Sequence, residues 1–197
     1  MTEPFQCGLV LLAAGGSRRM GRPKQLLPIR GKPLVRHVAE AALAAPVASV
    51  VVVLGAEAEQ VRTVLKDLPL QLALNPDWSV GMSSSLRVGV KTAIAHSPGL
   101  QALMIALADQ PDFSQDHVTR MIARYSRGDC TAVASLADGA MVPPILFDRS
   151  WFDKLCAIQG DIGARALLKE RTDLVATVSV GSSTDLDTPE DYAQFIN

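Results

Sequence analysis

The stretch LVLLAAGGSRRMGRPKQLLPIRGKPLV, residues 9–35, begins as an unbroken apolar run and continues into a loop rich in glycine and basic residues. An apolar run of this length that ends at glycines is typical of a strand buried on both faces of a sheet. Four residues with almost no side chain close the run: Ala13, Ala14, Gly15 and Gly16. Such a backbone can approach a ligand closely and offer its N–H groups to phosphate oxygens. The stretch therefore predicts a buried strand followed by an anion-binding loop.

Short apolar runs and amphipathic segments alternate along the rest of the chain. Strands are predicted at residues 8–14, 48–54, 70–74, 102–108, 131–136, near 145 and at 174–180. Helices are predicted at 34–45, 57–68 and 83–96, after 114, around 151, at 161–170 and from 189 onward. This alternation predicts a doubly wound, mostly parallel α/β sheet with helices on both faces, built by residues 1–197 as one domain. Ligands of such sheets bind beyond the carboxyl ends of the strands.

Composition argues against several classes of protein. The formal net charge of −1 is unlike the basic excess of general nucleic-acid binders. No apolar segment reaches the roughly 20 residues of a membrane span, and the N-terminus lacks the positive charge of a signal peptide. We therefore expect a soluble, cytoplasmic protein. Its three cysteines, Cys7, Cys130 and Cys156, are widely spaced, as is typical of reduced structural thiols.

Positive charge is concentrated in the loop after the first predicted strand. Residues 15–32 contain six of the nineteen basic residues and no acidic residue, which leaves the rest of the chain at −7. The six are Arg18, Arg19, Arg22, Lys24, Arg30 and Lys32. A basic loop on an acidic body favours binding of a small polyanion, although a purely solvated loop has the same composition.

The loop matches neither of two widespread phosphate-binding motifs. A P-loop requires G-x-x-x-x-G-K-[ST], but Gly16 and Gly21 are followed by Arg-Pro-Lys, and G-x-G-x-x-G is absent. Pro23 restricts the backbone before Lys24 and so helps to fix its ammonium group. A lysine that faces an α-phosphate would stabilise the charge that builds as pyrophosphate leaves.

Two carboxylates are candidate metal ligands. Asp109 directly follows the apolar run LMIALA, so we expect it at the ligand-binding rim of the sheet. Asp187 lies in DLDTPED, before a helix that Thr188 could cap and Pro189 could begin. Mg²⁺ prefers carboxylate oxygens and water. A capping carboxylate without a metal gives the same pattern.

The segment VGMSSSLRVGV places Gly81 and three serines at the start of a predicted helix. Helix N-termini with hydroxyls and free N–H groups bind anions or polar ring edges, although a serine-rich cap without a ligand looks the same. Trp78, just before this segment, is expected to pack internally or to line a pocket wall. The histidines, His37, His96 and His117, fall on predicted helices away from the rim and are not expected to be catalytic.

These motifs resemble, in the same order, those of the MobA-like nucleotidyltransferases. Residues 12–24 match the signature L-A-[AG]-G-x-S-x-R-M-G-x-x-K, and the resemblance extends to residues 75–89, 107–111, 160–168 and 185–191. It is strongest to the molybdenum cofactor cytidylyltransferase (MocA-type) branch. The resemblance implies a Mg²⁺-dependent enzyme that transfers a nucleotidyl group from a nucleoside triphosphate to a phosphorylated acceptor.

The resemblance also implies roles for particular residues. The nucleotide would contact Leu12, Ala13, Ala14, Gly15, Gly16, Gly81 and Ser85. Catalysis would depend on Lys24, Arg18 and Arg19. Mg²⁺ would be held by Asp109 together with Asp187 or, alternatively, Asp185, and the acceptor would contact Asp161 and Arg165.

Finer details of the resemblance indicate which nucleotide base and which acceptor the enzyme would use. The chain reads L-A-A-G at residues 12–15, as the cytidylyl-transferring branch does, whereas the guanylyl-transferring branch reads L-A-G-G. This difference favours CTP over GTP. One methyl group, however, discriminates between two ligands by only about 1–3 kcal/mol. The implied acceptor is molybdopterin, with a molybdenum hydroxylase or its maturation factor as a partner. Residues 140–144, AMVPP, depart from the branch pattern. The alternatives are GTP:molybdopterin transfer, a sugar phosphate or methylerythritol phosphate acceptor, and a non-catalytic cofactor-binding chaperone.

Overall fold

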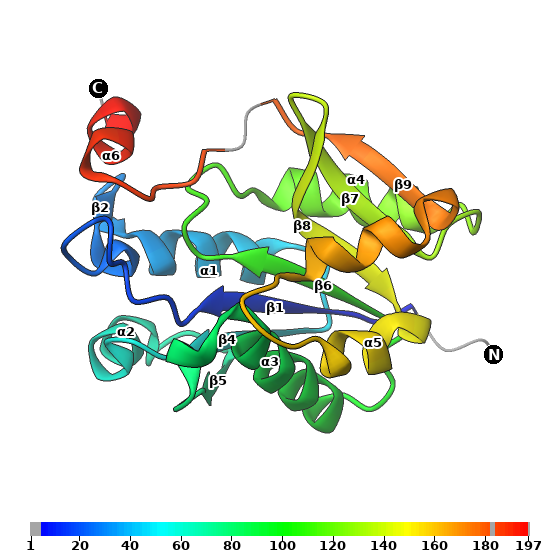
Figure 1. Cartoon of the computed structure of the whole chain (residues 1–197), viewed down its shortest axis with the longest axis horizontal. Helices are drawn as coiled ribbons and strands as arrows, with labels where there is room; N and C mark the ends of the chain where they lie inside the picture. The colour runs from blue at the N-terminus through cyan, green and yellow to red at the C-terminus, as the bar shows by residue number, and fades with distance from the viewer. Residues whose placement is uncertain (1–4, 182–183, 197) are drawn as a thin grey trace.

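The computed structural model describes residues 5–181 and 184–196, and in them a seven-stranded sheet forms the centre of the molecule (Figure 1). The strand order is β5-β4-β1-β6-β8-β7-β9, and only β8 runs antiparallel to its neighbours. The strands are β1 (Cys7–Ala13), β4 (Ser49–Leu54), β5 (Gln71–Leu74), β6 (Ala102–Leu107), β7 (Ala132–Ala137), β8 (Ala140–Asp148) and β9 (Val175–Ser179). The predicted doubly wound, mostly parallel sheet is confirmed.

Helices cover both faces of the sheet, and alternate side chains of β1 reach both layers. Leu9 and Leu11 pack on one face with α1 (Leu34–Ala44), α2 (Ala58–Leu65) and α4 (Gln115–Tyr125). Val10 and Leu12 pack on the other face with α3 (Met82–His96) and α5 (Phe152–Ala157). Every residue of β1 is buried, which explains why its sequence is continuously apolar rather than alternating. In the described ranges no helix is both long and apolar enough to cross a membrane.

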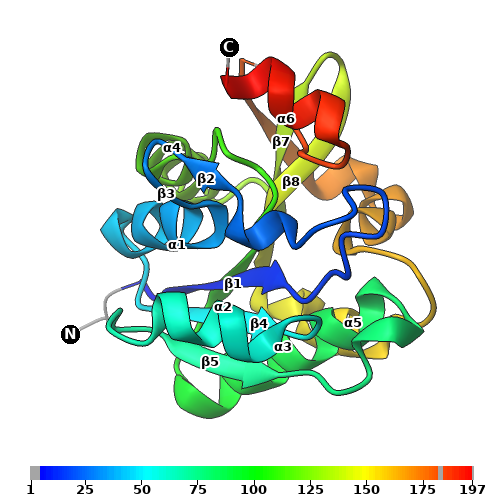
Figure 2. The same ribbon diagram turned by 90° about the vertical axis from the view of Figure 1, so that its left-hand side faces the viewer.

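The C-terminal helix α6 (Pro189–Ile196) lies beside a small hairpin of β2 (Pro28–Ile29) and β3 (Lys32–Pro33), at the edge where the loop after β1 emerges (Figures 1 and 2). The Tyr192 hydroxyl donates to the carbonyl oxygen of Pro28 at 2.9 Å, and the Arg22 guanidinium lies over the Tyr192 ring. The last helix is thereby fastened to the same segment that carries Lys24.

One predicted helix begins later than expected. A helix was predicted at residues 161–170, and the structure has a 3₁₀ helix, η4 (Ala164–Glu170), which begins three residues further on. Asp161 instead accepts a hydrogen bond from the Met82 amide at 3.1 Å, and the Met82 sulfur packs directly over Gly163. These contacts bind residues 161–163 to the start of α3, so the helical turns begin only after them.

The buried His117 belongs to a network of hydrogen bonds within the core and is not part of a catalytic site. Its side chain is 4% exposed, with Nε2 2.8 Å from the Ser135 hydroxyl and Nδ1 3.1 Å from the Arg120 guanidinium. Because a guanidinium can only donate, Nδ1 accepts and Nε2 carries the hydrogen. The Ser135 hydroxyl then donates to the carbonyl oxygen of Pro144 at 2.8 Å. Burial, with the charge of Arg120, lowers the pKa of His117 to about 4.

This network predicts a pH-dependent stability. In the unfolded chain His117 gains a proton near pH 6.5, whereas in the folded protein it gains one only near pH 4. The stabilisation that neutral His117 gives to the folded protein is therefore complete above pH 6.5 and is lost as the pH falls toward 4. Between pH 7 and pH 5 the free energy of unfolding should fall by about 2 kcal/mol from this group. Urea titrations of wild type and His117→Asn check this. The variant should be less stable at pH 7 but lose less on acidification; equal losses in both proteins would contradict the assignment.

Candidate functional site

A pocket of about 510 Å³ opens at the carboxyl ends of β1 and β6. It is lined by residues 12–19, which are the end of β1 and the start of the loop after it, with Lys24 and Gln25. The other lining residues are 78–82 with Ser85, 107–109, and Asp161. Most residues predicted from the sequence therefore meet in one pocket. These are Leu12, Ala13, Ala14, Gly15, Gly16, Arg18, Arg19, Lys24, Gly81, Ser85, Asp109 and Asp161.

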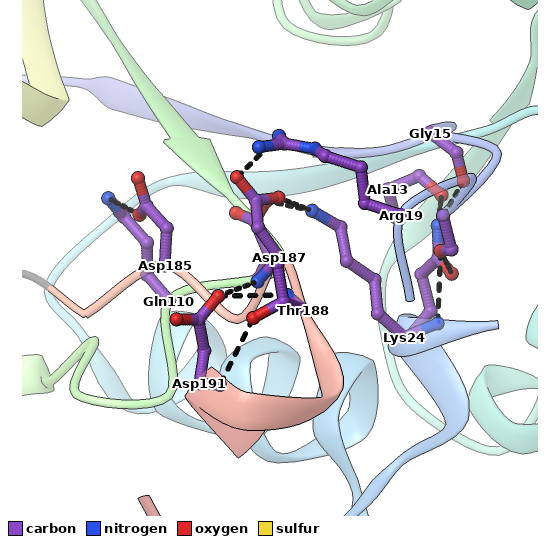
Figure 3. A network of polar contacts seen from close by, with 12 residues as sticks. Ala13, Gly15, Arg19, Lys24, Gln110, Asp185, Asp187, Thr188 and Asp191 are labelled. Carbon is purple, nitrogen blue, oxygen red and sulfur yellow. Dashed lines mark hydrogen bonds and ion pairs between the residues drawn. The ribbon is translucent and has the colours of Figure 1, made fainter. Parts of the chain in front are cut away.

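Lys24 bridges two carboxylates at one end of this pocket. Its ammonium nitrogen lies 2.5 Å from Asp109 Oδ2 and 2.9 Å from Asp187 Oδ1. The Arg19 guanidinium contacts Asp187 Oδ2 at 2.6 Å, and Figure 3 shows both cations converging on Asp187. The side chains of Lys24 and Asp109 are only 14% and 18% exposed. Asp187 is not itself part of the pocket lining but is joined to it through these two ion pairs.

The charges of this cluster reinforce one another. Burial opposes the charged form of Lys24, but the attraction and hydrogen bonds of Asp109 and Asp187 outweigh it and raise the pKa of the ammonium. Burial likewise opposes ionisation of Asp187, but the hydrogen bond and charge of Lys24, with Arg19, lower the pKa of that carboxyl. Lys24 and Asp187 are therefore both charged at neutral pH.

Asp187 is held in place by the cap of α6. The Asp191 carboxylate accepts hydrogen bonds from the backbone N–H of Asp187 at 3.2 Å and of Thr188 at 2.8 Å. The Thr188 hydroxyl accepts in return from the Asp191 amide at 3.2 Å, which completes a reciprocal capping box. The Leu186 amide donates to the Asp109 carbonyl oxygen at 3.1 Å. The predicted cap at Thr188 is confirmed, whereas the part played by Asp191 was not foreseen.

Asp185, the alternative metal ligand, is engaged elsewhere. Its Oδ1 accepts a hydrogen bond from the Gln110 side-chain amide at 3.0 Å, and in Figure 3 this pair lies apart from Lys24. Partial desolvation of the carboxyl raises the pKa of Asp185, and the negative charges of Asp109 and Asp187 add to that effect. The geometry favours Asp187 over Asp185 as the partner of Asp109.

The opposite wall of the pocket is built at the start of α3. A Cβ on Gly81 would lie 2.9 Å from the carbonyl oxygen of Gly160 and 3.0 Å from the Asp161 backbone, so only glycine fits there. The Ser85 hydroxyl lines the pocket and accepts from the Asn75 amide at 2.9 Å. Trp78 forms part of the same wall, and a Cβ on Gly16 would come within 2.8 Å of its ring.

The two residues predicted to bind the acceptor lie in different places. Asp161 is at the pocket, where it also caps α3 through the Met82 amide. Arg165 is exposed, lies outside the pocket lining, and is 3.5 Å from the Met141 carbonyl oxygen. Their contact with an acceptor stays a prediction.

The donor set suits a divalent cation that keeps part of its water shell. Asp109 Oδ1 is buried and has no hydrogen-bond partner within the described part of the chain, although Oδ2 is paired with Lys24. A buried carboxylate oxygen without a partner is costly unless something binds it. The same part of the chain contains no group of three or more acidic, histidine or cysteine side chains that could enclose a metal. Two carboxylates with water and phosphate oxygens match the coordination that Mg²⁺ prefers.

A mostly parallel α/β sheet with a glycine-rich loop, a buried lysine and two carboxylates at its carboxyl edge has the architecture of enzymes that transfer nucleotides. Residues 9–175 match the family described as the MobA-like NTP transferase domain, and the chain belongs to this family of nucleotidyltransferases. The family predicted from the sequence is confirmed.

Several named proteins are similar to this chain over nearly its whole length. The chain is 36% identical over 191 residues to nicotine blue oxidoreductase of Paenarthrobacter nicotinovorans, covering 92% of each protein. It is 34% identical over 203 residues to the purine catabolism protein PucB of Bacillus subtilis strain 168, covering 98% of the chain and 96% of the relative. The crystal structure of Rv0371c from Mycobacterium tuberculosis H37Rv has a TM-score of 0.86 at 26% identity over 98% of both chains, and that protein has also been solved in complex with manganese.

Proposed function

We propose that the protein is a Mg²⁺-dependent CTP:molybdopterin cytidylyltransferase. The observation that carries the proposal is the pairing of Lys24 with Asp109 and Asp187 beside the glycine-rich loop of residues 15–24, with Asp109 Oδ1 left without a partner among the described residues. This arrangement offers a cation for phosphate and two carboxylates for a metal, of which Asp109 lines the pocket and Asp187 is joined to it through Lys24. The product, a dinucleotide form of molybdopterin, would pass to a molybdenum hydroxylase or its maturation factor.

The reaction requires no nucleophilic side chain. A phosphate oxygen of the acceptor attacks the α-phosphorus of CTP, and the bond from the α-phosphorus to the bridging oxygen breaks as pyrophosphate leaves with the electron pair. The attacking phosphate is already ionised, so positioning and charge stabilisation suffice. Mg²⁺, held by Asp109 and Asp187, would neutralise charge on the phosphate oxygens.

The residues of the basic loop bind the phosphates and stabilise their negative charge. The backbone of Gly15 and Gly16 lies along the triphosphate, because no side chain keeps the phosphates away. Arg18 and Arg19 neutralise the outer phosphates from the exposed rim of the pocket. Lys24, buried at the base of the loop, stabilises the charge that builds on the α-phosphate.

The choice of base is proposed to depend on Ala14. Its side chain is buried at 5% exposure, and a Cβ on Gly55 would meet both the Ala14 methyl at 2.7 Å and the Trp78 Cβ at 2.6 Å. The methyl group and the tryptophan thus pack around the same glycine. We propose that Ala14 supports the position of Trp78, which narrows the pocket for a pyrimidine.

A thermal-shift comparison of CTP, GTP, ATP and UTP, each with and without Mg²⁺, tests this proposal. A ligand at about a hundred times its dissociation constant should stabilise by about 2.7 kcal/mol, or roughly 5–10 °C for a chain of this size. We expect a Mg²⁺-dependent shift confined to CTP. A GTP preference would assign guanylyl transfer instead, and no shift with any nucleotide would contradict the proposal.

A second candidate function is a redox reaction, which the 36% identity to nicotine blue oxidoreductase favours. An oxidoreductase could hold a nucleotide-containing reductant in the same pocket but would release no pyrophosphate. Stabilisation by NADH or NADPH without a metal, followed by oxidation of the reductant, would support this function. Metal-dependent pyrophosphate release from CTP and molybdopterin would support transfer, and would also exclude a non-catalytic chaperone.

A further inference from the structure

Gln25 has a buried polar side chain that contacts the backbone at the start of the basic loop. It is 3% exposed, although it follows Lys24 directly in the chain. Its amide nitrogen donates to the carbonyl oxygens of Ala13 at 3.2 Å and of Gly15 at 2.6 Å. Its Oε1 accepts from the Ser17 hydroxyl at 3.2 Å. Both amide hydrogens and the amide oxygen are thereby used.

These contacts fix one peptide group. A trans peptide is planar, so its N–H points opposite to its carbonyl oxygen. Because the Gly15 carbonyl oxygen accepts from the Gln25 amide, the N–H of Gly16 points away from the Gln25 amide. A peptide between two glycines is easily rotated, since neither neighbour has a Cβ to resist the change. Rotation would turn a carbonyl oxygen, which repels phosphate, to the side where the N–H now lies.

The Gln25 side chain also helps to hold Lys24 in position, through Ser17. The Lys24 backbone N–H donates to the Ser17 hydroxyl at 3.0 Å, and that hydroxyl donates onward to Gln25. Ser17 itself has a left-handed backbone with φ of 51°, which is unfavourable for a serine unless neighbouring contacts hold it. The turn that contains Ser17 and the start of the segment that carries Lys24 are therefore locked together.

We infer that Gln25 is a positioning residue for nucleotidyl transfer: it orients the peptide between Gly15 and Gly16 with its N–H toward the nucleotide phosphates. This inference rests on the proposed function and assigns a role to a residue that does not react. Gln25 acts only through the backbone and through the placement of Lys24.

Gln25→Glu is the sharpest test, because it keeps the size and the acceptor oxygen but removes both hydrogens from the amide. The two carbonyl oxygens would then face a carboxylate instead of a donor. We expect kcat for pyrophosphate release to fall about 100-fold, the size of effect seen when one oriented backbone or amide donor is lost. Gln25→Met, which removes every hydrogen bond but fills the space, should lose a similar amount.

Ser135→Ala is the matched control, since it removes a buried hydrogen-bonded side chain of β7 that is not part of the pocket lining. It should lower the melting temperature as the Gln25 variants do, yet retain kcat. If Ser135→Ala loses transfer in proportion to stability, or if Gln25→Glu retains wild-type kcat, the positioning role is overturned.

A second readout needs no turnover. In ¹H–¹⁵N spectra of wild type, the Gly16 amide should shift on addition of CTP with Mg²⁺, and in Gln25→Glu that shift should be lost. A wild-type protein that neither binds CTP nor releases pyrophosphate would refute the proposed function itself. An active wild type whose Gly16 amide does not respond would refute only the role of Gln25.

Discussion

Replacing Asp109 by asparagine is expected to lower kcat for nucleotidyl transfer at least a thousandfold, which corresponds to about 4 kcal/mol of transition-state stabilisation. The substitution removes the charge on the most buried carboxylate of the site, including the oxygen that has no partner among the described residues. An asparagine oxygen is a weaker ligand for a divalent cation than a carboxylate, and the amide group would also meet the Lys24 ammonium. Pyrophosphate release measures the loss of activity.

Metal binding separates this loss from a general effect on folding. Titration of Mn²⁺ followed by electron paramagnetic resonance, in the presence of CTP, should show at least a tenfold weaker affinity in Asp109→Asn. Asp67→Asn is the matched control, because Asp67 is a carboxylate paired with Arg36 and lies outside the pocket lining. Full activity of Asp109→Asn, with unchanged Mn²⁺ affinity, would contradict the metal site.

The same titration decides between the two C-terminal carboxylates. Asp187→Asn should weaken Mn²⁺ binding as Asp109→Asn does, because Asp187 shares Lys24 with Asp109. Asp185→Asn should have the smaller effect, since Asp185 is paired with Gln110. The reverse order would assign the metal to Asp185.

Replacing Lys24 by methionine is expected to have the second large effect, a fall of about 10²–10³ in kcat, through loss of a preorganised positive charge at the reacting phosphate. The substitution keeps the length and apolar stem of the side chain. A matched control is Lys32→Met, which removes a half-exposed lysine paired with Glu40. The control should retain activity.

Lys24→Met should also change metal affinity in the opposite direction from activity. Without nucleotide, the ammonium is the counter-ion of both Asp109 and Asp187, so a divalent cation must compete with it. We expect the nucleotide-free variant to bind Mn²⁺ several-fold more tightly than wild type. Unchanged kcat would contradict the catalytic role, and weaker Mn²⁺ binding would contradict the competition.

The part of the fold that sequence reasoning predicted well depends on local patterns. The strand β1 and the loop after it follow from one apolar run and its glycines, and Asp109 follows from its place directly after β6. The turn at Asp138 and Gly139 was missed although its signal was present, since both residues have positive φ in a two-residue hairpin between β7 and β8. An Asp-Gly pair between two apolar runs is the expected sequence for such a turn.

What could not be predicted depends on contacts between distant segments. Nothing local distinguishes Gln25 from an exposed glutamine, because its burial arises from the carbonyl groups of Ala13 and Gly15. The environment of His117 likewise depends on Ser135 of β7, and the 3₁₀ form of η4 on contacts with α3. Asp187 was found through a motif, but its ion pair with Lys24 required the fold.

The site joins residues from both ends of the chain: Asp187 follows Lys24 by 163 positions. During synthesis on the ribosome, the basic loop therefore emerges long before its second carboxylate, and the lysine has only Asp109 as a partner until nearly all of the chain has been made. A message cut short after β9 would still encode all seven strands of the central sheet and the loop of residues 15–24, but not Asp187 or α6. Such a product would keep Lys24 and Asp109 but lack Asp187, so the codons after β9 supply the second carboxylate of the proposed metal site.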